Sequence, residues 1–392
     1  MTTFTDLGVS APTLAALERR GILTPFPIQE LVVPDALLGR DVLAKSATGS
    51  GKTLAFALPI VERVDRSATQ PSVLILVPTR ELAVQVVGEF EDISKAKELR
   101  VAAVYGGVAM GAQAKDAARA HILVATPGRM EDLANRRMVS LGAVRTLVLD
   151  EADRMLDMGF QPQVDRLVAR LRGERHTMFF SATLEGTVGH LARQYTRDAV
   201  LHEVASAQRT VAEAEHRFIP VAQAARVDAL VQLLREEPGR HLVFVRTKRG
   251  ADRLAKRLRD RGLRAAPMHG DLTQAAREKA LQGFHGGRID TLVATDVAAR
   301  GLDIHDITHV VNYDPPADDT SYLHRVGRTA RAGRSGHGVT FVIPTDQGDV
   351  GRMASRLELE DEFTTEGMKV APPRMVFQSR RGGVMGSRRK RR

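Results

Sequence analysis

Short runs of apolar, β-branched residues recur along this chain, and they restrict its possible folds more than any other feature. Each run is closed by a Gly, Thr, Ser or Asp cluster and is followed by a helix-like stretch. This alternation is typical of parallel strands joined by helical crossovers, because parallel sheets are covered by helices on both faces. The expected strands are 41–44, 72–77, 101–104, 121–125, 146–149 and 177–180, and then 241–245, 264–268, 291–294, 309–312 and 338–343. The sequence therefore predicts an α/β protein with two sheets.

The expected strands divide the chain into two domains. At roughly 100 to 200 residues per domain, a chain of 392 residues is long enough for two cores. We place the linker at residues 205–215, where small and polar residues show no apolar period. The first domain is then 1–204 and the second is 216–347. We expect residues 348–392 to form a helical extension and a disordered basic tail, because residues 379–392 contain almost nothing to bury.

Composition excludes several classes of protein. The chain has no Cys, which rules out a disulfide-stapled module and any Cys-ligated zinc or iron–sulfur site. No stretch approaches the roughly 18 apolar residues of a membrane span, and residues 1–10 lack a signal-peptide pattern, so we expect a cytoplasmic protein without membrane contact. The formal charge of +10 favours an acidic partner, with nucleic acid the leading candidate. A ribosome-associated protein, or one that is merely soluble, would have the same charge balance.

A phosphate-binding loop is predicted at residues 47–53, Ala-Thr-Gly-Ser-Gly-Lys-Thr, between an expected strand and an expected helix. Glycines there let backbone N–H groups close around phosphate oxygens, and the helix N-terminus adds its dipole. Lys52 would reach the β- and γ-phosphates, and the Thr53 hydroxyl would ligate Mg²⁺. The general pattern has Gly five residues before Gly51, where this chain has Ser46. The alternative is a Gly/Ser turn without a ligand.

An acidic sequence at the end of another strand would complete the metal site. The expected strand 146–149 ends in Asp150, Glu151, Ala152 and Asp153. Asp150 leaves an apolar strand, where its carboxylate can meet Mg²⁺ without being buried unpaired. Glu151 is placed to orient or deprotonate the attacking water. The alternative is a solvated acidic turn before a helix.

With these motifs the chain resembles the DEAD-box RNA helicases of superfamily 2, of the bacterial type with a short basic tail. The matching motifs occur in order at 21–29, 46–53, 78–83, 106–107, 126–129, 150–153, 181–183, 243–247, 274–277, 294–303 and 324–331. The resemblance covers about residues 4–344. It implies two RecA-like domains of the P-loop NTPase kind, each with a parallel sheet, joined by a short linker and closing around ATP and RNA.

The resemblance implies that both domains contribute to one ATP site. Gln29 would read the adenine, Asp303 would hold the ribose, and Arg328 and Arg331 would act as arginine fingers on the γ-phosphate. Ile22 stands where the family usually has an aromatic ring, so stacking near the adenine would be weaker or fall to Phe4. The expected ATP-binding residues are Phe4, Gln29, Ser46, Ala47, Thr48, Gly49, Ser50, Gly51, Lys52, Thr53, Asp303, Arg328 and Arg331, with Thr53 and Asp150 on Mg²⁺.

A hydrogen-bonded relay from Ser181, Thr183 and Asp153 to His324 would tie hydrolysis to RNA binding, as the resemblance implies. The expected catalytic residues are Lys52, Asp150, Glu151, Ser181, Thr183, His324, Arg328 and Arg331. The chain departs from the family pattern at Ile22, at Phe26 where Thr is usual, at Ser46, at Val326 and at Ala330. None of these changes removes a charged catalytic group, so we expect an active ATPase.

RNA contacts are expected to run along the sugar-phosphate backbone, because 4% aromatic residues and no Trp argue against a platform that stacks successive bases. In the first domain the candidates are Pro78, Thr79, Arg80, Gly106, Gly107, Thr126, Pro127, Gly128 and Arg129. In the second domain they are Arg246, Thr247, Gln274, Arg277, Thr295 and Arg300. Such contacts carry little sequence information. For any one of these residues, a turn or a helix cap is the alternative.

Much of the net charge lies outside the two domains. Seven basic residues fall between Arg380 and Arg392, and the rest of the chain has 50 basic against 47 acidic residues. The tail is therefore expected to bind phosphates nonspecifically, or to serve only solubility. Placed arginines and backbone amides must supply the RNA site of the two domains.

Together with the resemblance, the sequence implies a monomeric ATP-dependent RNA helicase whose RNA-stimulated ATP hydrolysis is coupled to local unwinding of short duplexes and to remodelling of RNA–protein complexes. Its partner would be single-stranded and duplex RNA, with ribosomal precursors and RNA-decay complexes as candidate settings. An ATP-gated RNA clamp or annealing chaperone would share every motif. A DNA-directed translocase is disfavoured, because Asp150 to Asp153 occur together with the motif at 21–29.

Overall fold

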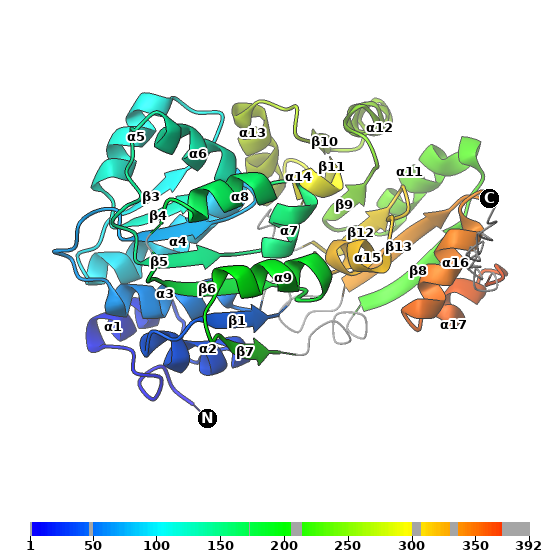
Figure 1. Ribbon diagram of the computed structural model, residues 1–392. Helices are drawn as coiled ribbons and strands as arrows, with labels where there is room; N and C mark the ends of the chain where they lie inside the picture. The colour runs from blue at the N-terminus through cyan, green and yellow to red at the C-terminus, as the bar shows by residue number, and fades with distance from the viewer. Residues whose placement is uncertain are drawn as a thin grey trace, which may run out of the picture.

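The structure, a computed structural model, describes residues 2–46, 50–171, 173–204, 214–299, 307–329 and 336–370. Figure 1 shows two sheets side by side, each with helices packed against it. Every strand pairing in both sheets is parallel. The two-sheet α/β fold predicted from the sequence is therefore confirmed.

The first sheet has seven strands in the order β3-β4-β2-β5-β6-β1-β7. Its strands are β1 (Val42–Lys45), β2 (Val73–Leu76), β3 (Val101–Val104), β4 (Ile122–Ala125), β5 (Thr146–Leu149), β6 (His176–Ser181) and β7 (Val200–Glu203). The helices of this half are α1 (Ala11–Arg19), α2 (Pro27–Leu37), α3 (Lys52–Arg63), α4 (Arg80–Ala96), α5 (Met110–Arg119), α6 (Pro127–Asn135), α7 (Ala152–Asp157), α8 (Gln161–Val168) and α9 (Gly186–Tyr195).

The second sheet has six strands in the order β10-β11-β9-β12-β13-β8. Its strands are β8 (Ala214–Pro220), β9 (His241–Phe244), β10 (Ala265–Met268), β11 (Thr291–Ala294), β12 (His309–Asn312) and β13 (Gly336–Val342). The helices are the 3₁₀ turn η1 (Gln223–Ala225), α11 (Arg226–Glu236), α12 (Lys248–Asp260), α13 (Gln274–His285), α14 (Asp296–Ala299), α15 (Asp319–Val326), α16 (Gln347–Arg356) and α17 (Glu360–Thr364).

Each sheet is buried on both faces, which explains the apolar runs in the sequence. On β2, Val73 and Ile75 pack into one core cluster, and Leu74 and Leu76 pack into the cluster on the opposite face. Successive side chains of a strand point to opposite faces, so a strand covered on both sides needs an unbroken apolar run. Removing one such side chain would leave a cavity and cost about 2–5 kcal/mol.

Two strands escaped prediction, and both lie at a sheet edge. β7 reads Val-Leu-His-Glu, and β8 contains a Glu, a His and an Arg, so neither is a continuous apolar run. Edge strands are covered less completely and tolerate such residues. Ala214 and Glu215, which we expected in the linker, are the first residues of β8 and pair with β13. Residues 205–213 lie outside the described residues.

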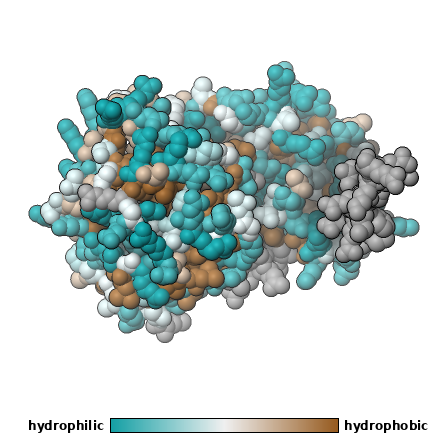
Figure 2. All heavy atoms as spheres, viewed as in Figure 1, coloured by the Kyte–Doolittle hydropathy of each residue, from teal (hydrophilic) through white to brown (hydrophobic). Residues whose placement is uncertain are grey.

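Helices α16 and α17, in the region where we expected a helical extension, pack against β8. The rings of Phe218 on β8 and Phe363 on α17 lie 5.4 Å apart, edge to face, and both side chains are fully buried. The expected basic tail, residues 379–392, lies outside the described part of the chain. Among the helices that the structure describes, none is long and apolar enough to cross a bilayer. Figure 2 shows hydrophilic residues over much of the visible face.

The strand order brings three motif-bearing loops to one edge of the first sheet. β1 lies next to β6, and β6 lies next to β5. Because all three strands are parallel, the residues that follow them meet at the same edge. These are Ser46 after β1, Asp150 after β5 and Ala182 after β6.

Candidate functional site

The phosphate loop starts from a buried and hydrogen-bonded position. The backbone N–H of Ser46 donates to the carbonyl of Ser181 at 3.1 Å, which ties the loop to β6. Lys52, the first residue of α3, is 7% exposed, and its Nζ donates to the Ser46 carbonyl at 2.8 Å. The lysine therefore spans the loop from one end to the other. Ala47, Thr48 and Gly49 were expected to bind ATP, and they lie outside the described residues.

Three carboxyl groups follow β5 in a buried cluster. Asp150, Glu151 and Asp153 are 3%, 5% and 8% exposed. Burial raises the pKa of Asp150 to about 7, against the pull of the Lys52 charge. Burial also raises the pKa of Asp153. A carboxyl group whose charge is this poorly compensated would be stabilised by an added cation.

Glu151 differs from its neighbours in its charge partners. Burial opposes its ionisation, but the positive charges of Arg154, Lys52 and Arg328 together hold the pKa of Glu151 below its ordinary value. Arg154 forms an ion pair with Glu151 and is 2% exposed. Glu151 has a left-handed backbone with φ +52°, which is uncommon for a residue with a side chain. The structure thus keeps Glu151 ionised and in an unusual conformation.

Asp150 and Thr53 offer oxygen ligands of the kind that Mg²⁺ prefers. Among the described residues, no group of three or more His, Asp or Glu side chains could hold an ion. Mg²⁺ is usually bound through one or two carboxylates together with substrate phosphates and water. Thr53 is the second residue of α3, and its hydroxyl fits that pattern together with the Asp150 carboxylate.

The structure brings part of the expected relay together. The Ala182 N–H donates to Asp153 Oδ2 at 3.2 Å, and the Thr183 N–H donates to Ser181 Oγ at 3.3 Å. His324 lies on α15 of the second half, where its carbonyl accepts a 3.4 Å hydrogen bond from Arg328 Nε. Arg328 follows α15, and its positive charge is one of those that lower the pKa of Glu151 in the first half. Arg331 and Asp303 lie outside the described residues.

Gln29 connects the start of α2 to the phosphate loop. Its Oε1 accepts from the Phe26 N–H at 2.9 Å, and its Nε2 donates to the Gly51 carbonyl at 2.9 Å. The side chain is fully buried. Phe4, which we expected to stack near the adenine, is 3% exposed within the core.

In the first half, the expected RNA residues lie at the N-termini of α4 and α6 and in the loop after β3. Thr79 caps α4 by accepting from the Leu82 N–H at 3.2 Å. The Arg80 guanidinium covers Gly107, where an added Cβ would lie only 2.3 Å from Nη1. Arg129 Nη1 donates to Gln113 at 3.0 Å. The other candidates are Pro78 and Pro127, both buried, Thr126 at the start of α6, Gly106 and Gly128.

In the second half, the expected RNA residues follow the carboxyl ends of β9 and β11 or lie on α13. Arg246 and Thr247 are exposed, and Thr247 caps α12 by accepting from the Gly250 N–H at 3.0 Å. Thr295 is 7% exposed before α14. Gln274, the first residue of α13, donates to Glu278 at 3.0 Å. Arg300 lies outside the described residues.

Arg277 makes a contact that sequence reasoning missed. Its Nη2 lies 2.8 Å from Glu81 Oε1, and both side chains are nearly buried, at 10% and 12% exposure. Glu81 belongs to α4 of the first half and Arg277 to α13 of the second, so this ion pair joins the two halves. Glu81 was within a recognised motif at 78–83, but nothing in the sequence identifies its partner.

Arg325 is a second residue that sequence reasoning missed. It forms a two-pronged ion pair with Asp296 at 2.6 and 2.7 Å and donates to Asn312 Oδ1 at 2.9 Å. Its guanidinium also lies over the Phe244 ring, 4.8 Å from the centroid. Arg325 therefore fixes α15, which carries His324, against β12 and α14. Its position next to His324 was the only sequence signal.

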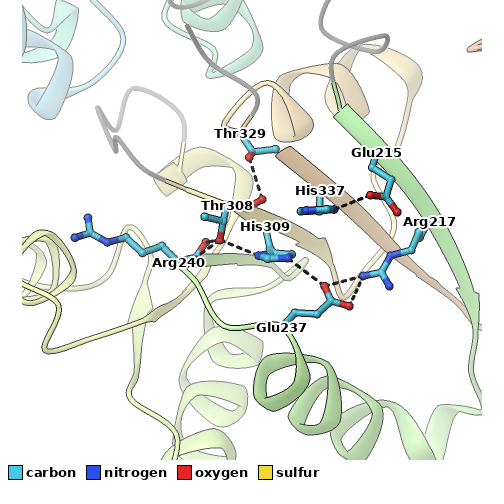
Figure 3. Close-up of polar contacts among 8 residues, drawn as sticks. All are labelled: Glu215, Arg217, Glu237, Arg240, Thr308, His309, Thr329 and His337. Carbon is cyan, nitrogen blue, oxygen red and sulfur yellow. Dashed lines mark hydrogen bonds and ion pairs between the residues drawn. The ribbon is translucent and has the colours of Figure 1, made fainter. Parts of the chain in front are cut away.

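A separate titratable cluster lies at the amino end of the second sheet (Figure 3). The rings of His241, His309 and His337 stack in that order, with 4.7 Å between neighbouring centroids. His309 Nε2 lies 3.1 Å from Glu237, and His337 Nδ1 lies 3.1 Å from Glu215. This end of the sheet is opposite to the end from which Arg246 and Thr295 emerge.

Comparisons with known proteins agree with the motifs. Residues 26–191 match the family model described as DEAD/DEAH box helicase, and residues 225–333 match the helicase conserved C-terminal domain. The chain is 43% identical to the ATP-dependent RNA helicase CshA of Listeria monocytogenes, over 89% of this chain and 67% of the relative. It is 42% identical to the DEAD-box ATP-dependent RNA helicase CshA of Geobacillus kaustophilus, over 89% and 75%.

Solved structures give the same result for the fold. S. cerevisiae Dbp5 bound to RNA and ADP BeF3 superposes with a TM-score of 0.82 at 29% identity, covering 95% of each chain. A variant of Dbp5 bound to Gle1 and IP6 gives a TM-score of 0.73 at 30% identity, covering 91% of this chain and 92% of that one. The chain thus superposes better on the RNA- and ADP BeF3-bound form of Dbp5 than on the Gle1-bound variant.

Proposed function

This chain belongs to the DEAD-box family of ATP-dependent RNA helicases, and from that premise we propose that its RNA-dependent ATPase drives local separation of short RNA duplexes and remodelling of RNA–protein complexes. The observation that carries the proposal is one site assembled from both sheets. Arg328 of the second half acts on Glu151 of the first, and Arg277 pairs with Glu81. Closing the two halves would therefore complete the ATP site and align the RNA contacts in one step.

For hydrolysis, the ionised Glu151 would accept a proton from the attacking water. Lys52 and Arg328 would stabilise the charge that develops on the γ-phosphate, in a cluster from which bulk water is largely excluded. Thr53 and Asp150 would hold Mg²⁺, which would neutralise phosphate charge when bound. Arg331 and Asp303 keep the roles expected from the sequence, as the second finger and the ribose contact.

For RNA, helix N-termini and guanidinium groups at the carboxyl ends of both sheets would bind phosphates. Thr79 and Thr247 cap α4 and α12, and Arg80 lies over Gly107. These groups recognise backbone rather than base edges, so we propose binding that is largely independent of sequence. We further propose that the protein works as a cytoplasmic monomer.

Strand separation with a labelled short RNA duplex tests the proposal. The duplex should separate in the presence of protein, RNA and ATP, and much less with a non-hydrolysable ATP analogue that supports a single closure. Persistent RNA binding in ATP without strand release would instead identify an ATP-gated clamp. ATP hydrolysis stimulated by DNA but not by RNA would contradict both readings.

A further inference from the structure

Phe26 occupies a position that suits its side chain poorly. It is the N-cap of α2, where Ser, Thr, Asp and Asn are preferred because their side chains accept a hydrogen bond from the first helical turn. A phenyl ring has no acceptor, so this cap is lost. The ring is also 53% exposed to solvent. The missing side-chain cap and the exposed large ring are two local costs at one residue.

The ring lies directly beside the phosphate loop. A Cβ built on Gly51 would lie 2.9 Å from Phe26 Cδ2 and 2.6 Å from Gln29 Nε2. Gly51 has φ +86° and immediately precedes Lys52. A residue that contacts Gly51 therefore lies beside the expected nucleotide site. The Phe26 backbone N–H also donates to Gln29 Oε1 at 2.9 Å. The three residues Phe26, Gln29 and Gly51 therefore contact one another, and the Phe26 ring leaves one aromatic face exposed.

The two other positions from which a ring was expected present none. Ile22 is aliphatic and packs against the first core cluster, and Phe4 is 3% exposed within that cluster. Phe26 is the residue of the three with an accessible aromatic face. An exposed ring beside a nucleotide site has an obvious ligand, because every nucleobase offers a flat face for stacking.

We propose that Phe26 contacts bound ATP by stacking its ring on the adenosine. This inference rests on the proposed ATP site and adds a residue to it. Stacking does not distinguish one purine from another, whereas hydrogen bonds do. Gln29 keeps a second N–H on Nε2 and a second lone pair on Oε1 beyond the bonds it makes to the backbone. Phe26 would thus supply affinity and Gln29 would supply selectivity.

The first experiment uses Phe26→Thr and Phe26→Ala. Thr restores a capping oxygen, so the midpoint of thermal unfolding should stay the same or rise, while the affinity for ATP falls by about tenfold. The affinity for GTP should fall by the same factor. Inorganic tripolyphosphate, which has no base, should bind both variants as it binds the unchanged protein. Isothermal titration calorimetry with the full chain measures all three ligands.

The second experiment uses the absence of Trp from the chain. Phe26→Trp introduces a single fluorescent reporter, which ATP should quench and tripolyphosphate should not. Leu38→Trp is the matched control, because Leu38 is 76% exposed just beyond the other end of α2 and should not respond to ATP.

Four outcomes separate this inference from the proposed function. Undiminished ATP affinity in Phe26→Ala, with RNA-stimulated ATP hydrolysis intact in the unchanged protein, overturns the role of Phe26 alone. Equal losses for ATP and tripolyphosphate would also overturn it, because Phe26 would then only support the phosphate loop. Failure of the unchanged protein to hydrolyse ATP with RNA would contradict the proposed function itself. Loss of ATP affinity with normal tripolyphosphate binding and a stable fold supports stacking.

Discussion

Two clusters of titratable side chains differ in their position and in the direction of their pKa shifts. One lies at the carboxyl end of the first sheet, and the other lies at the amino end of the second sheet. Asp150, Glu151 and Asp153 follow the carboxyl end of β5, and burial raises the pKa of Asp150 to about 7. At the amino end of the second sheet, burial lowers the pKa of His241 to about 4. Burial thus drives Asp150 and Asp153 toward the protonated form and His241 toward the neutral form, while Glu151 stays ionised. Asp150 and His241 therefore respond to pH with opposite signs.

The difference lies in where the partners come from. The histidine stack is completed within its own half, by ring stacking and by Glu237. Both carboxylate oxygens of Glu237 also accept from Arg217 Nη2, at 2.6 and 2.8 Å (Figure 3). The acid cluster draws on Arg328 from the other half and would draw on a ligand cation. A cluster whose partners all lie in its own half can have a purely structural role. A cluster whose partners come from the other half and from a ligand can respond to ligand binding and to closure of the two halves.

The sharpest way to break the acid cluster is Glu151→Gln. The substitution keeps the size of the side chain and removes the base, so RNA-stimulated ATP hydrolysis should fall by about 10²- to 10⁴-fold, while ATP and RNA still bind. A phosphate-release assay at saturating RNA measures the rate. Glu174→Gln is the control, because Glu174 is exposed in the same half. Near-normal hydrolysis in Glu151→Gln would remove Glu151 from the mechanism.

The dependence of the acid cluster on closure is tested at the ion pair between the halves. Glu81→Arg or Arg277→Glu places two like charges together in a nearly buried contact, and RNA-stimulated hydrolysis should fall by about 10- to 100-fold. The double variant, with the charges exchanged, should recover much of the loss. Arg264→Glu is the control, because the Arg264–Asp290 pair is exposed and within one half. Equal loss in the double variant would show that the pair itself is not the cause.

The pH response of the acid cluster is tested with Asp150→Asn. In the folded protein the pKa of Asp150 is raised from 3.8 to about 7, so its protonated form is favoured by folding. That contribution is fully present below about pH 4 and is lost as the pH rises through about 7. The variant should therefore gain stability relative to the unchanged protein, by on the order of 4 kcal/mol more at pH 8 than at pH 4. Urea unfolding without nucleotide measures it, and parallel pH curves for the two proteins would contradict the assignment.

Most of the fold could be predicted, and the candidate site could be proposed, because their signals are local. The apolar runs, the loop ending in Gly51-Lys52 and the acids after β5 each depend on neighbouring residues in the sequence. All eleven expected strands are present in the structure. The two missed strands lie at edges, where the apolar run that identifies a buried strand is weakest.

What could not be predicted depends on register and on packing between distant segments. His241, His309 and His337 are far apart in sequence, and they stack because β9 and β13 both pair with β12 in a register that aligns them. The Arg277–Glu81 pair needs the relative placement of two domains, which no local pattern specifies. Phe26 was recognised as a departure from the family, but its exposed face beside Gly51 follows only from the coordinates.

The smallest expected effect comes from the histidine stack, through His241→Phe. His241 is 2% exposed and stacks on His309, and Glu237 and Asp290 are the nearby acids that favour its charged form. Because its folded pKa is lowered to about 4, its contribution to stability is present above pH 6.5 and is lost as the pH falls through about 4. A phenyl ring can stack without taking up a proton.

The His241→Phe variant should therefore resist acid better, by on the order of 2 kcal/mol at pH 4.5 relative to pH 7.5, with unchanged RNA-stimulated hydrolysis at pH 7.5. Urea unfolding across that range measures the first expectation and a phosphate-release assay the second. His285→Phe, at an exposed position on α13, is the control. If hydrolysis at pH 7.5 fell in His241→Phe while the fold stayed intact, the stack would not be a purely structural cluster, and the contrast between the two sheet ends would be wrong.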